Sequence, residues 1–405
     1  MFSLPSLRFS ISLAACLLTC AAMRSEEVQG LRHEKRSEDG VQAAIHFRNH
    51  PFWKAGGSEL PSVPGAEWMQ SIGLDLAFTY DSLALGALTS GEGWGSASGD
   101  ATLNMHWHIN DADSRSPLSL NVRARHRHAY DDSPPSALKS QTQALWGHVD
   151  GFTAAGFQVP ELYLEDLLFD RRLTLRYGQM TIDDLLDGHE LRSAKRSFMN
   201  QAFSSSPAVG FPGADLGFIA RWQGRKGWEL AMALSSLTGS NLRETADWRL
   251  TGDAMFQAVQ LARDFTWVPG RMSRVQMLVW RADASSQAGL EPGRGVSLTL
   301  EHPFTKSTRA FIKYAWSDGE AATTRHFAAV GAAHDLSRVD RVGVAMAAGR
   351  AIKDERWQGV LEFFYRRQAG RSLLITPDVQ LVVGDEVAGG QGWVVVAGLR
   401  MGLTF

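Results

Sequence analysis

The chain has 405 residues, of which 44% are hydrophobic and 21% are charged, and its formal net charge is −2 at pH 7. This composition is too polar for a bundle of membrane-spanning helices. The charge argues against a nucleic-acid partner, which normally requires an excess of basic residues. A soluble protein and a transmembrane β-barrel are both compatible with these values, because a barrel needs apolar residues only at alternate strand positions.

Residues 1–22 have the pattern of a secretory signal peptide. Arg8 supplies the basic region, residues 9–22 are largely apolar, and residues 20–22 (Cys-Ala-Ala) form a small-residue cleavage site. Residues 13–16 also fit a lipoprotein box, although they lie early in the apolar run. Both cysteines of the chain fall within this segment, so we expect an exported protein whose mature form has no disulfide and no thiolate metal site.

Residues 23–65 are charged and rich in turn-forming residues, without clear periodicity. We predict an N-terminal arm here. Its structure is left open by the sequence: a disordered segment, a short periplasmic segment and a plug inside a barrel all fit this composition.

From residue 66 to residue 405 the apolar residues alternate with polar or small ones, which is the signature of β-strands. The alternating runs are 9 to 11 residues long, as a tilted strand needs to cross a membrane, whereas strands of soluble proteins average five or six residues. About 16 such runs can be counted, within a range of 14 to 18. Short turns are mixed with long gaps, the longest at residues 131–151 and 183–213. We therefore predict an all-β, antiparallel transmembrane barrel and disfavour a soluble sandwich.

The last run, residues 393–405, places Trp393, Leu399 and Phe405 on one face and Arg400 on the other. A strand that alternates in this way and ends in an aromatic residue is typical of barrels that the outer-membrane insertion machinery recognises. We therefore expect the insertion machinery and outer-membrane lipid as partners, in the bacterial outer membrane. The thirteen Trp and 20 Phe of the chain agree with this location, because aromatic rings favour membrane interfaces.

Two segments resemble the carbohydrate-selective porin (OprB) family. Residues 358–380 with the end of the chain are similar to its closing strands, and residues 175–203 are similar to a strand and the loop after it. The positions that carry the resemblance are Phe198, Asn200, Phe203, Pro377, Asp378, Gln380, Arg400 and Phe405. The resemblance extends diffusely over residues 72–405. It implies passive diffusion of small neutral solutes, sugars above all, through a water-filled lumen, without a cofactor. Residues 90–99 and 183–195 do not align, which leaves the choice of solute open.

A channel acts through the radius of its pore and the polar groups on its wall. On the predicted alternation, the candidates for the wall of the pore are Arg123, Arg125, Arg176, Glu229, Glu301, Glu362 and Arg366. The long loop after the strand at residue 177 adds Asp183, Arg192 and Arg196, and we expect it to fold inward as a constriction. Two simpler alternatives are an external position for this loop and a bracing role for the wall residues through cross-strand pairs.

His106 and His108 lie on one predicted strand, and His126 and His128 lie on the next. With the turn centred near residue 113, His106 pairs with residue 121 and His126 with residue 101, so the two histidine pairs are separated and we expect no metal site.

The sequence has no phosphate loop and no zinc-protease motif, so we predict no enzyme. A general diffusion porin, an outer-membrane barrel hydrolase and an adhesive or structural barrel are the alternatives. The sequence leaves both a monomer and a trimer open.

Overall fold

The computed structural model describes residues 66–89, 95–110, 116–238, 254–286, 288–370 and 372–404. The described residues belong to one compact unit, which spans Phe47–Phe405. The predicted signal peptide at residues 1–22, the arm at residues 23–65 and the terminal Phe405 lie outside the described residues. Among the described helices, none is both long enough and apolar enough to span a membrane.

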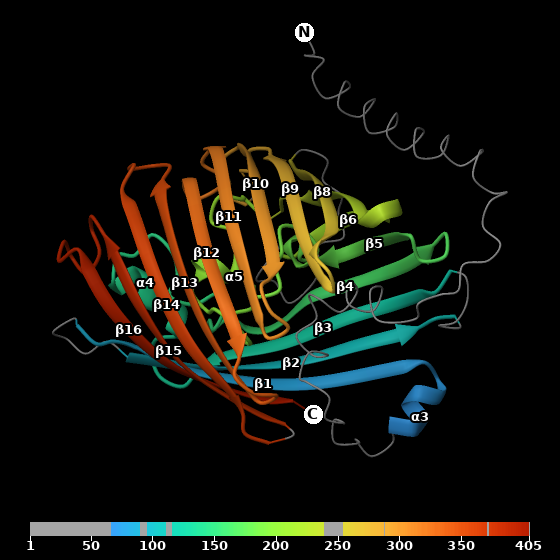
Figure 1. Cartoon of the computed structure of the whole chain (residues 1–405), viewed down its shortest axis with the longest axis horizontal. Coiled ribbons are helices and arrows are strands. Elements are labelled where there is room, and N and C mark those ends of the chain that lie inside the picture. Colours follow the sequence, from blue (N-terminus) through green and yellow to red (C-terminus); the bar gives the residue numbers. More distant parts are fainter. Residues whose placement is uncertain are drawn as a thin grey trace, which may run out of the picture. The chain divides into compact units, whose positions relative to one another are not determined.

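Sixteen antiparallel strands in the described part of the chain form a closed barrel (Figure 1), as the sequence predicts. The first eight strands are β1 (Leu74–Ala87), β2 (Gly95–His108), β3 (Leu118–Ala129), β4 (Gly156–Leu168), β5 (Leu173–Met180), β6 (Asp215–Gln223), β7 (Trp228–Ser236) and β8 (Met255–Val268). The other eight are β9 (Arg271–Ala282), β10 (Gly293–Pro303), β11 (Thr308–Gly319), β12 (Thr324–Asp335), β13 (Asp340–Ala351), β14 (Trp357–Gln368), β15 (Leu373–Gly384) and β16 (Trp393–Thr404). Each strand pairs with its neighbours in sequence, and β1 pairs with β16, so the sheet has no free edge.

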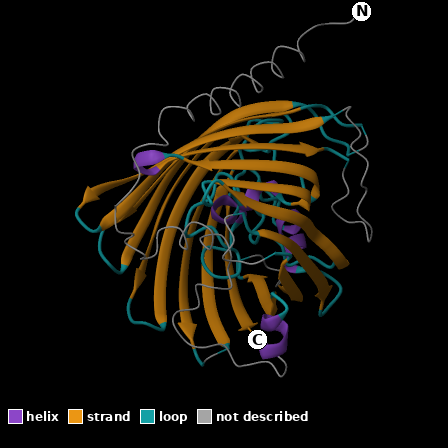
Figure 2. Ribbon diagram, turned by 90° about the vertical axis from the view of Figure 1, so that its right-hand side faces the viewer, coloured by secondary structure: helices purple, strands orange, loops and turns teal. Residues whose placement is uncertain are grey.

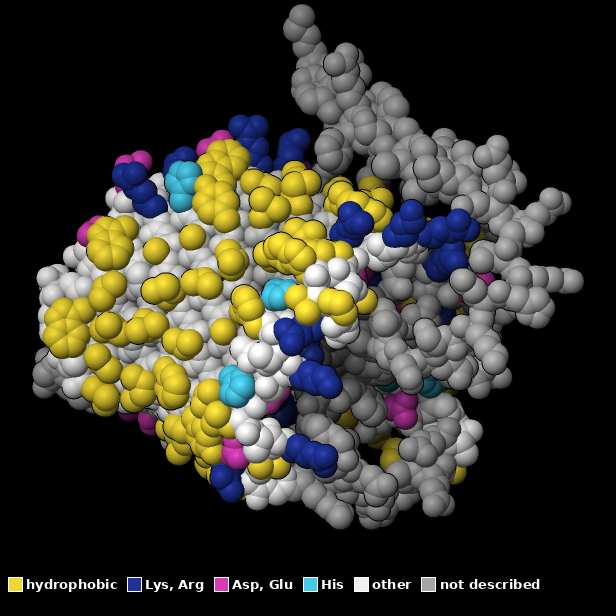
Figure 3. All heavy atoms as spheres, in the orientation of Figure 1, with side chains coloured by type: hydrophobic (Ala, Val, Ile, Leu, Met, Phe, Trp, Pro, Cys, Tyr) yellow, Lys and Arg dark blue, Asp and Glu magenta, His cyan; other side chains and the backbone are white. Residues whose placement is uncertain are grey.

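The alternation of the sequence determines which face of each strand points outward. On β13, Val344 and Met346 are exposed on the outer surface, whereas Ala345 and Ala347 are buried inside. The outer surface in Figure 3 is correspondingly apolar between two rims that carry charged side chains. An apolar exterior around a polar interior is the arrangement of a membrane barrel and the reverse of a soluble sandwich.

The register of the hairpin that contains the four histidines agrees with the prediction, since His106 pairs with Asn121 and His126 pairs with Ala101. Thr102, four residues before His106 on the same strand, lines the interior of the barrel, as does Arg125 beside His126. The alternation therefore places His106 inside and His126 outside. The two histidine pairs lie on opposite faces of the wall, which prevents them from sharing one metal ion.

One end of the barrel has short turns, and the other end has the long loops. Two long loops, at residues 130–155 and 181–214, enter the lumen (Figure 2). We call them loop β3–β4 and loop β5–β6. The short helices in the described residues are α3 (Ala66–Ser71) before β1, η1 (Pro135–Ala137) and α4 (Leu138–Gln141) in loop β3–β4, η2 (Ile182–Asp184) and α5 (Gln201–Ser204) in loop β5–β6, and η3 (Arg225–Gly227) between β6 and β7.

The inner wall of β12 and β13 is made mostly of small side chains, and the two loops pack against it. Phe198 and Phe203 of loop β5–β6 belong to one buried cluster with Phe311 and Phe364 of the wall. Trp146 of loop β3–β4 joins the same cluster. The wall needs glycine at position 349, because a Cβ atom there would lie 2.7 Å from the Trp146 ring. The lumen of a sixteen-stranded barrel is too wide to be filled by the side chains of the wall, and here the two inserted loops fill part of it.

Candidate functional site: a charged cavity inside the barrel

Loop β5–β6 is held inside the barrel by polar groups of the wall. The carboxylate of Glu362 on β14 accepts hydrogen bonds from the backbone N–H groups of Met199 (2.5 Å) and Asn200 (3.0 Å). The Asn200 side chain donates to Gln380 on β15 (2.8 Å) and caps the N-terminus of α5 through Ala202 N. These bonds satisfy backbone groups that would otherwise be buried without a partner.

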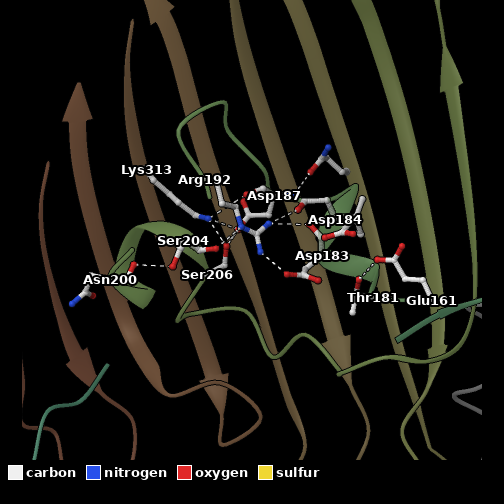
Figure 4. A network of polar contacts seen from close by, with 12 residues as sticks. Glu161, Thr181, Asp183, Asp184, Asp187, Arg192, Asn200, Ser204, Ser206 and Lys313 are labelled. Atoms are coloured by element: carbon white, nitrogen blue, oxygen red, sulfur yellow. Dashed lines mark hydrogen bonds and ion pairs between the residues drawn. The ribbon is translucent and has the colours of Figure 1, made fainter. Parts of the chain in front are cut away.

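A second anchor lies on the opposite part of the same loop (Figure 4). The carboxylate of Asp187 contacts the ammonium group of Lys313 on β11 and accepts hydrogen bonds from Ser206 (2.5 Å) and Ser297 (2.7 Å). The Asp187 backbone N–H donates to the side chain of Gln260 on β8 (2.7 Å). The loop is therefore bonded to β8, β10 and β11 as well as to β14 and β15.

Loop β3–β4 is fixed in a similar way. The amide of Gln380 donates to the carbonyl oxygen of His148 (2.8 Å), and Gln358 on β14 accepts from the backbone N–H of Leu145 (2.6 Å). The Trp146 indole N–H donates to Thr324 on β12 (2.9 Å). Burial lowers the pKa of His148 to about 4, so this imidazole is neutral at physiological pH and is bonded to the Thr142 hydroxyl (2.7 Å).

Between the two loops and the inner wall lies a cavity of about 1170 Å³, to which β1 to β3 and β11 to β15 contribute lining residues. It extends from Arg338 and Ala369, in two of the short turns, to Gly151 and Thr153 of loop β3–β4. Its charged lining residues are Asp81, Asp100, Arg123, Arg125, Arg127, Asp150, Asp183, Asp184, Glu190, Arg192, Lys195, Arg196, Arg309, Asp335, Arg338, Asp340, Arg341 and Arg366. The cavity is thus large enough for a small solute and is strongly polar.

The wall of β3 presents a row of three arginines to this cavity, at every second position of the strand. Arg123 pairs with Glu161 (2.5 Å) and Asp184 (3.3 Å), whereas Arg125 and Arg127 share the carboxylate of Asp100 at 3.5 and 3.2 Å. Because each guanidinium has a carboxylate partner, the row is held in place and its net charge is largely compensated.

The loops contribute carboxylates to the cavity lining as well. Asp183 pairs with Arg192 (2.7 Å), whose guanidinium also donates to the carbonyl oxygens of Leu186 and Ser204 (Figure 4). Desolvation raises the pKa of Asp183 to about 6; Arg192 opposes this shift, and the nearby carboxylates of Asp184 and Asp150 add to it. Asp183 therefore changes its charge within the range of pH in which a bacterium lives.

The structure brings six of the ten predicted site residues together in the cavity lining: Arg123, Arg125, Asp183, Arg192, Arg196 and Arg366. The other four are on the inner face of the sheet but do not line this cavity. Arg176 pairs with Glu165 (2.6 Å) and Glu229 pairs with Arg274 (2.6 Å), whereas Glu301 and Glu362 accept hydrogen bonds from the backbone of loop β5–β6. These four groups brace the wall or anchor the loop, which is the bracing alternative that the sequence left open.

The residues that carry the family resemblance also occupy defined places. Phe198, Asn200 and Phe203 lie in loop β5–β6, which enters the lumen as expected (Figure 2). Asp378, Gln380 and Arg400 are buried on the inner wall beneath that loop, and Pro377 is on the outward face of β15. Phe405 lies outside the described residues.

Several cavity residues were not among the predicted site residues, namely Asp81, Asp100, Asp150 and Lys195. Asp81 and Asp100 lie on the inner faces of β1 and β2, so applying the alternation to these two strands would have found them. Lys195 bridges both carboxylates, at 2.8 and 3.3 Å. No periodicity marks Lys195 or Asp150, since both lie in loops. In the described part of the chain, no three His, Cys, Asp or Glu side chains are grouped as metal ligands.

No family model matches the chain, and no curated protein matches it. Solved structures do. The high-pH structure of OprB from Pseudomonas putida has a TM-score of 0.70 at 12% identity, over 84% of this chain and 96% of that one. The anion-selective porin from Comamonas acidovorans (TM-score 0.51, 8% identity, 82% and 99%) and the outer-membrane channel DcaP of Acinetobacter baumannii (0.51, 11%, 82% and 97%) are also similar. The chain therefore has the fold of a sixteen-stranded bacterial outer-membrane porin, and its predicted resemblance to OprB is supported at the level of structure.

Proposed function

We propose that this protein is a bacterial outer-membrane channel through which small neutral solutes, chiefly sugars, diffuse passively. The observation that carries the proposal is the cavity of about 1170 Å³ inside the barrel, in which the arginine row of β3 faces carboxylates of the two inserted loops. A lumen lined by fixed donors and acceptors can exchange hydrogen bonds with a solute as it gives up its water shell. The proposed path runs past Arg123, Arg125 and Asp183.

The pairing of charges favours a neutral polyol over an ion at this part of the path. Arg123, Arg125 and Arg127 all have carboxylate partners, so the local net charge is small although the density of hydrogen-bonding groups is high. Sugar hydroxyls both donate and accept, and they fit a wall on which arginine donors and carboxylate acceptors alternate. Export would precede this function, and we propose that residues 1–22 are the cleaved signal and that residues 23–65 precede the barrel as an arm.

The test is a liposome-swelling assay with detergent-refolded mature protein. It compares glucose, a disaccharide and an amino acid of similar size to glucose with protein-free liposomes. We expect faster swelling with the sugars than with the size-matched amino acid. Equal rates would indicate a general diffusion porin, and an absence of swelling with all three solutes would overturn the channel.

The matched variants for this assay are Arg125→Gln and Arg294→Gln. Arg125 lines the cavity, whereas Arg294 is on the outer surface of the barrel, outside the cavity lining and 3.3 Å from Asp318. If the cavity is the path, Arg125→Gln changes the ratio of the sugar rate to the amino-acid rate, and Arg294→Gln leaves that ratio unchanged.

A further inference from the structure

The positive charges of the cavity are not all compensated. Most cavity cations have a carboxylate within ion-pair distance: the arginines of β3, Arg192 and Lys195 are examples described above, and Arg309 pairs with Glu190. Arg341 pairs with Asp335 through its Nε and one of its terminal nitrogens, each bonded to a different carboxylate oxygen. Three cavity cations differ, because they make no ion pair with any described carboxylate: Arg338 in the turn after β12, Arg196 of loop β5–β6 and Arg366 of β14. Arg338 is exposed, whereas Arg196 and Arg366 are partly buried.

These two arginines are neighbours. The Arg366 guanidinium donates to the backbone carbonyl oxygen of Arg196 (2.8 Å), and the Arg196 guanidinium donates to the Thr404 hydroxyl (3.2 Å). The Nε of Arg196 is buried and has no hydrogen-bond partner among the described residues. Each side chain is therefore held by a neutral acceptor, and within the described part of the chain its other N–H groups have no hydrogen-bond partner.

The electrostatic surroundings of Arg366 are unfavourable for a cation. Burial and the charges of Arg341, Arg196 and Arg400 act against it, and the charge of Asp335 supports it. Asp335 is itself engaged by Arg341. Like charges placed this close repel one another, and a bound anion would relieve the repulsion.

From this arrangement we infer that the cavity contains an oxyanion subsite formed by Arg196 and Arg366, beside the inner wall of β14 and β16. Its ligand is the carboxylate or phosphate group of a small solute, most simply that of an acidic or phosphorylated sugar. Guanidinium groups bind both kinds of group through paired N–H donors, and a cavity of about 1170 Å³ has room for the rest of the molecule. The inference rests on the proposed channel, since it extends the class of solutes that the channel accepts.

A different part of the cavity could have served as the anion site, and its geometry argues against it. The β3 row contains three arginines, but Asp100, Glu161 and Asp184 already occupy them. A solute anion would have to displace a fixed carboxylate there. At Arg196 and Arg366 it would displace no described carboxylate.

The experiment measures binding by isothermal titration to the purified full-length mature barrel in detergent, with gluconate, glucose 6-phosphate and glucose as the three ligands. We expect heat of binding for the two anions and none for glucose at the same concentration. The double variant Arg196→Gln/Arg366→Gln should weaken anion binding about tenfold or more, because charge-assisted hydrogen bonds are lost. Binding of gluconate alone would assign the subsite to carboxylates, and binding of glucose 6-phosphate alone would assign it to phosphates.

Two further variants separate the subsite from loop packing. Arg366→Lys keeps the positive charge but loses the paired donors of the guanidinium, so its binding should lie between those of the wild type and the double variant. Arg294→Gln, outside the cavity, should leave the binding unchanged. Glucose swelling is measured on every variant, so that loss of the channel is detected independently. Glucose swelling without anion binding would overturn the subsite and leave the channel standing. Anion binding that persists in the double variant would overturn the assignment to these two arginines.

Discussion

Lys313 on β11 and Asp187 in loop β5–β6 form an ion pair in the interior of the barrel, and their side chains are 2% and 1% exposed. Ser206 and Ser297 donate to the same carboxylate, so both its oxygens are bonded. A buried ion pair gains little net free energy over apolar packing, because both charges must be desolvated. Its effect here is positional, since only one placement of the loop brings the four groups together.

We predict that Asp187→Asn releases this part of loop β5–β6. Breaking a buried pair from one side costs about 3–5 kcal/mol, because the remaining charge has no counter-charge. The barrel sheet does not depend on this pair, so the loss should appear as faster proteolysis within residues 181–214 and as noisier single-channel current. The double variant Asp187→Asn/Lys313→Met removes both charges and should be less sensitive to protease than the single variant. Equal sensitivity of wild type and Asp187→Asn would contradict a role of the pair in holding the loop.

The charge on Asp183 should make the channel sensitive to pH. With a pKa raised to about 6 by desolvation, this carboxyl is charged at pH 8 and neutral at pH 5. The cavity therefore loses negative charge as the pH falls through about 6, and the permeability of anions relative to cations should rise. The reversal potential of planar bilayers under a KCl gradient measures this ratio between pH 8 and pH 5.

Asp183→Asn is the matched variant for the pH experiment. It should raise the relative permeability of anions at pH 8 and should reduce the change between pH 8 and pH 5. Asp150 also faces this region, and burial raises its pKa, so a smaller residual change is expected in the variant. An unaltered pH profile in Asp183→Asn would show that another group is responsible.

Phe198 links loop β5–β6 to the wall, with its ring centroid 4.9 Å from that of Phe364 and 5.4 Å from that of Phe203. Phe198→Ala should destabilise this packing by about 3–5 kcal/mol, as expected for a fully buried phenylalanine. The control is Phe363→Ala, whose side chain is on the outer, lipid-facing surface of β14. Hydrogen exchange of residues 181–214 should increase in Phe198→Ala and remain at the wild-type level in Phe363→Ala. If both variants behave alike, the aromatic cluster does not hold the loop.

The fold was predictable because a membrane barrel is specified locally. Each strand must present apolar residues to lipid at every second position, so residues such as Val344 and Met346 reveal the outward face without knowledge of their neighbours. The pairing of His106 with Asn121 followed from the position of one turn. Antiparallel neighbours in sequence are neighbours in space here, and closure adds only the pairing of β1 with β16.

The roles of the inward-facing charges were less predictable. Alternation places Glu362 and Arg366 on the same inner face of β14. The first is covered by loop β5–β6 and bonded to its backbone, whereas the second remains on the cavity. The path of the inserted loops decides whether an inward-facing charge is covered by a loop or lines the cavity. That path depends on contacts between positions more than 150 residues apart, as between Glu362 and Met199. No local pattern encodes such contacts.

The outward orientation of the apolar face gives a last prediction, on stability in the bilayer. Met346 lies mid-strand on the outer surface of β13 and is 56% exposed, beside Val330 and Leu361 of the adjacent strands. Met346→Arg should therefore reduce the free energy of folding into lipid vesicles by about 2–4 kcal/mol, whereas Leu336→Arg, in the short turn between β12 and β13, should cost about 0–1 kcal/mol. Urea titration of both variants in vesicles measures the two values. Equal costs at the two positions would mean that the mid-strand residue does not face the hydrocarbon layer, and would contradict the assignment of this surface to lipid.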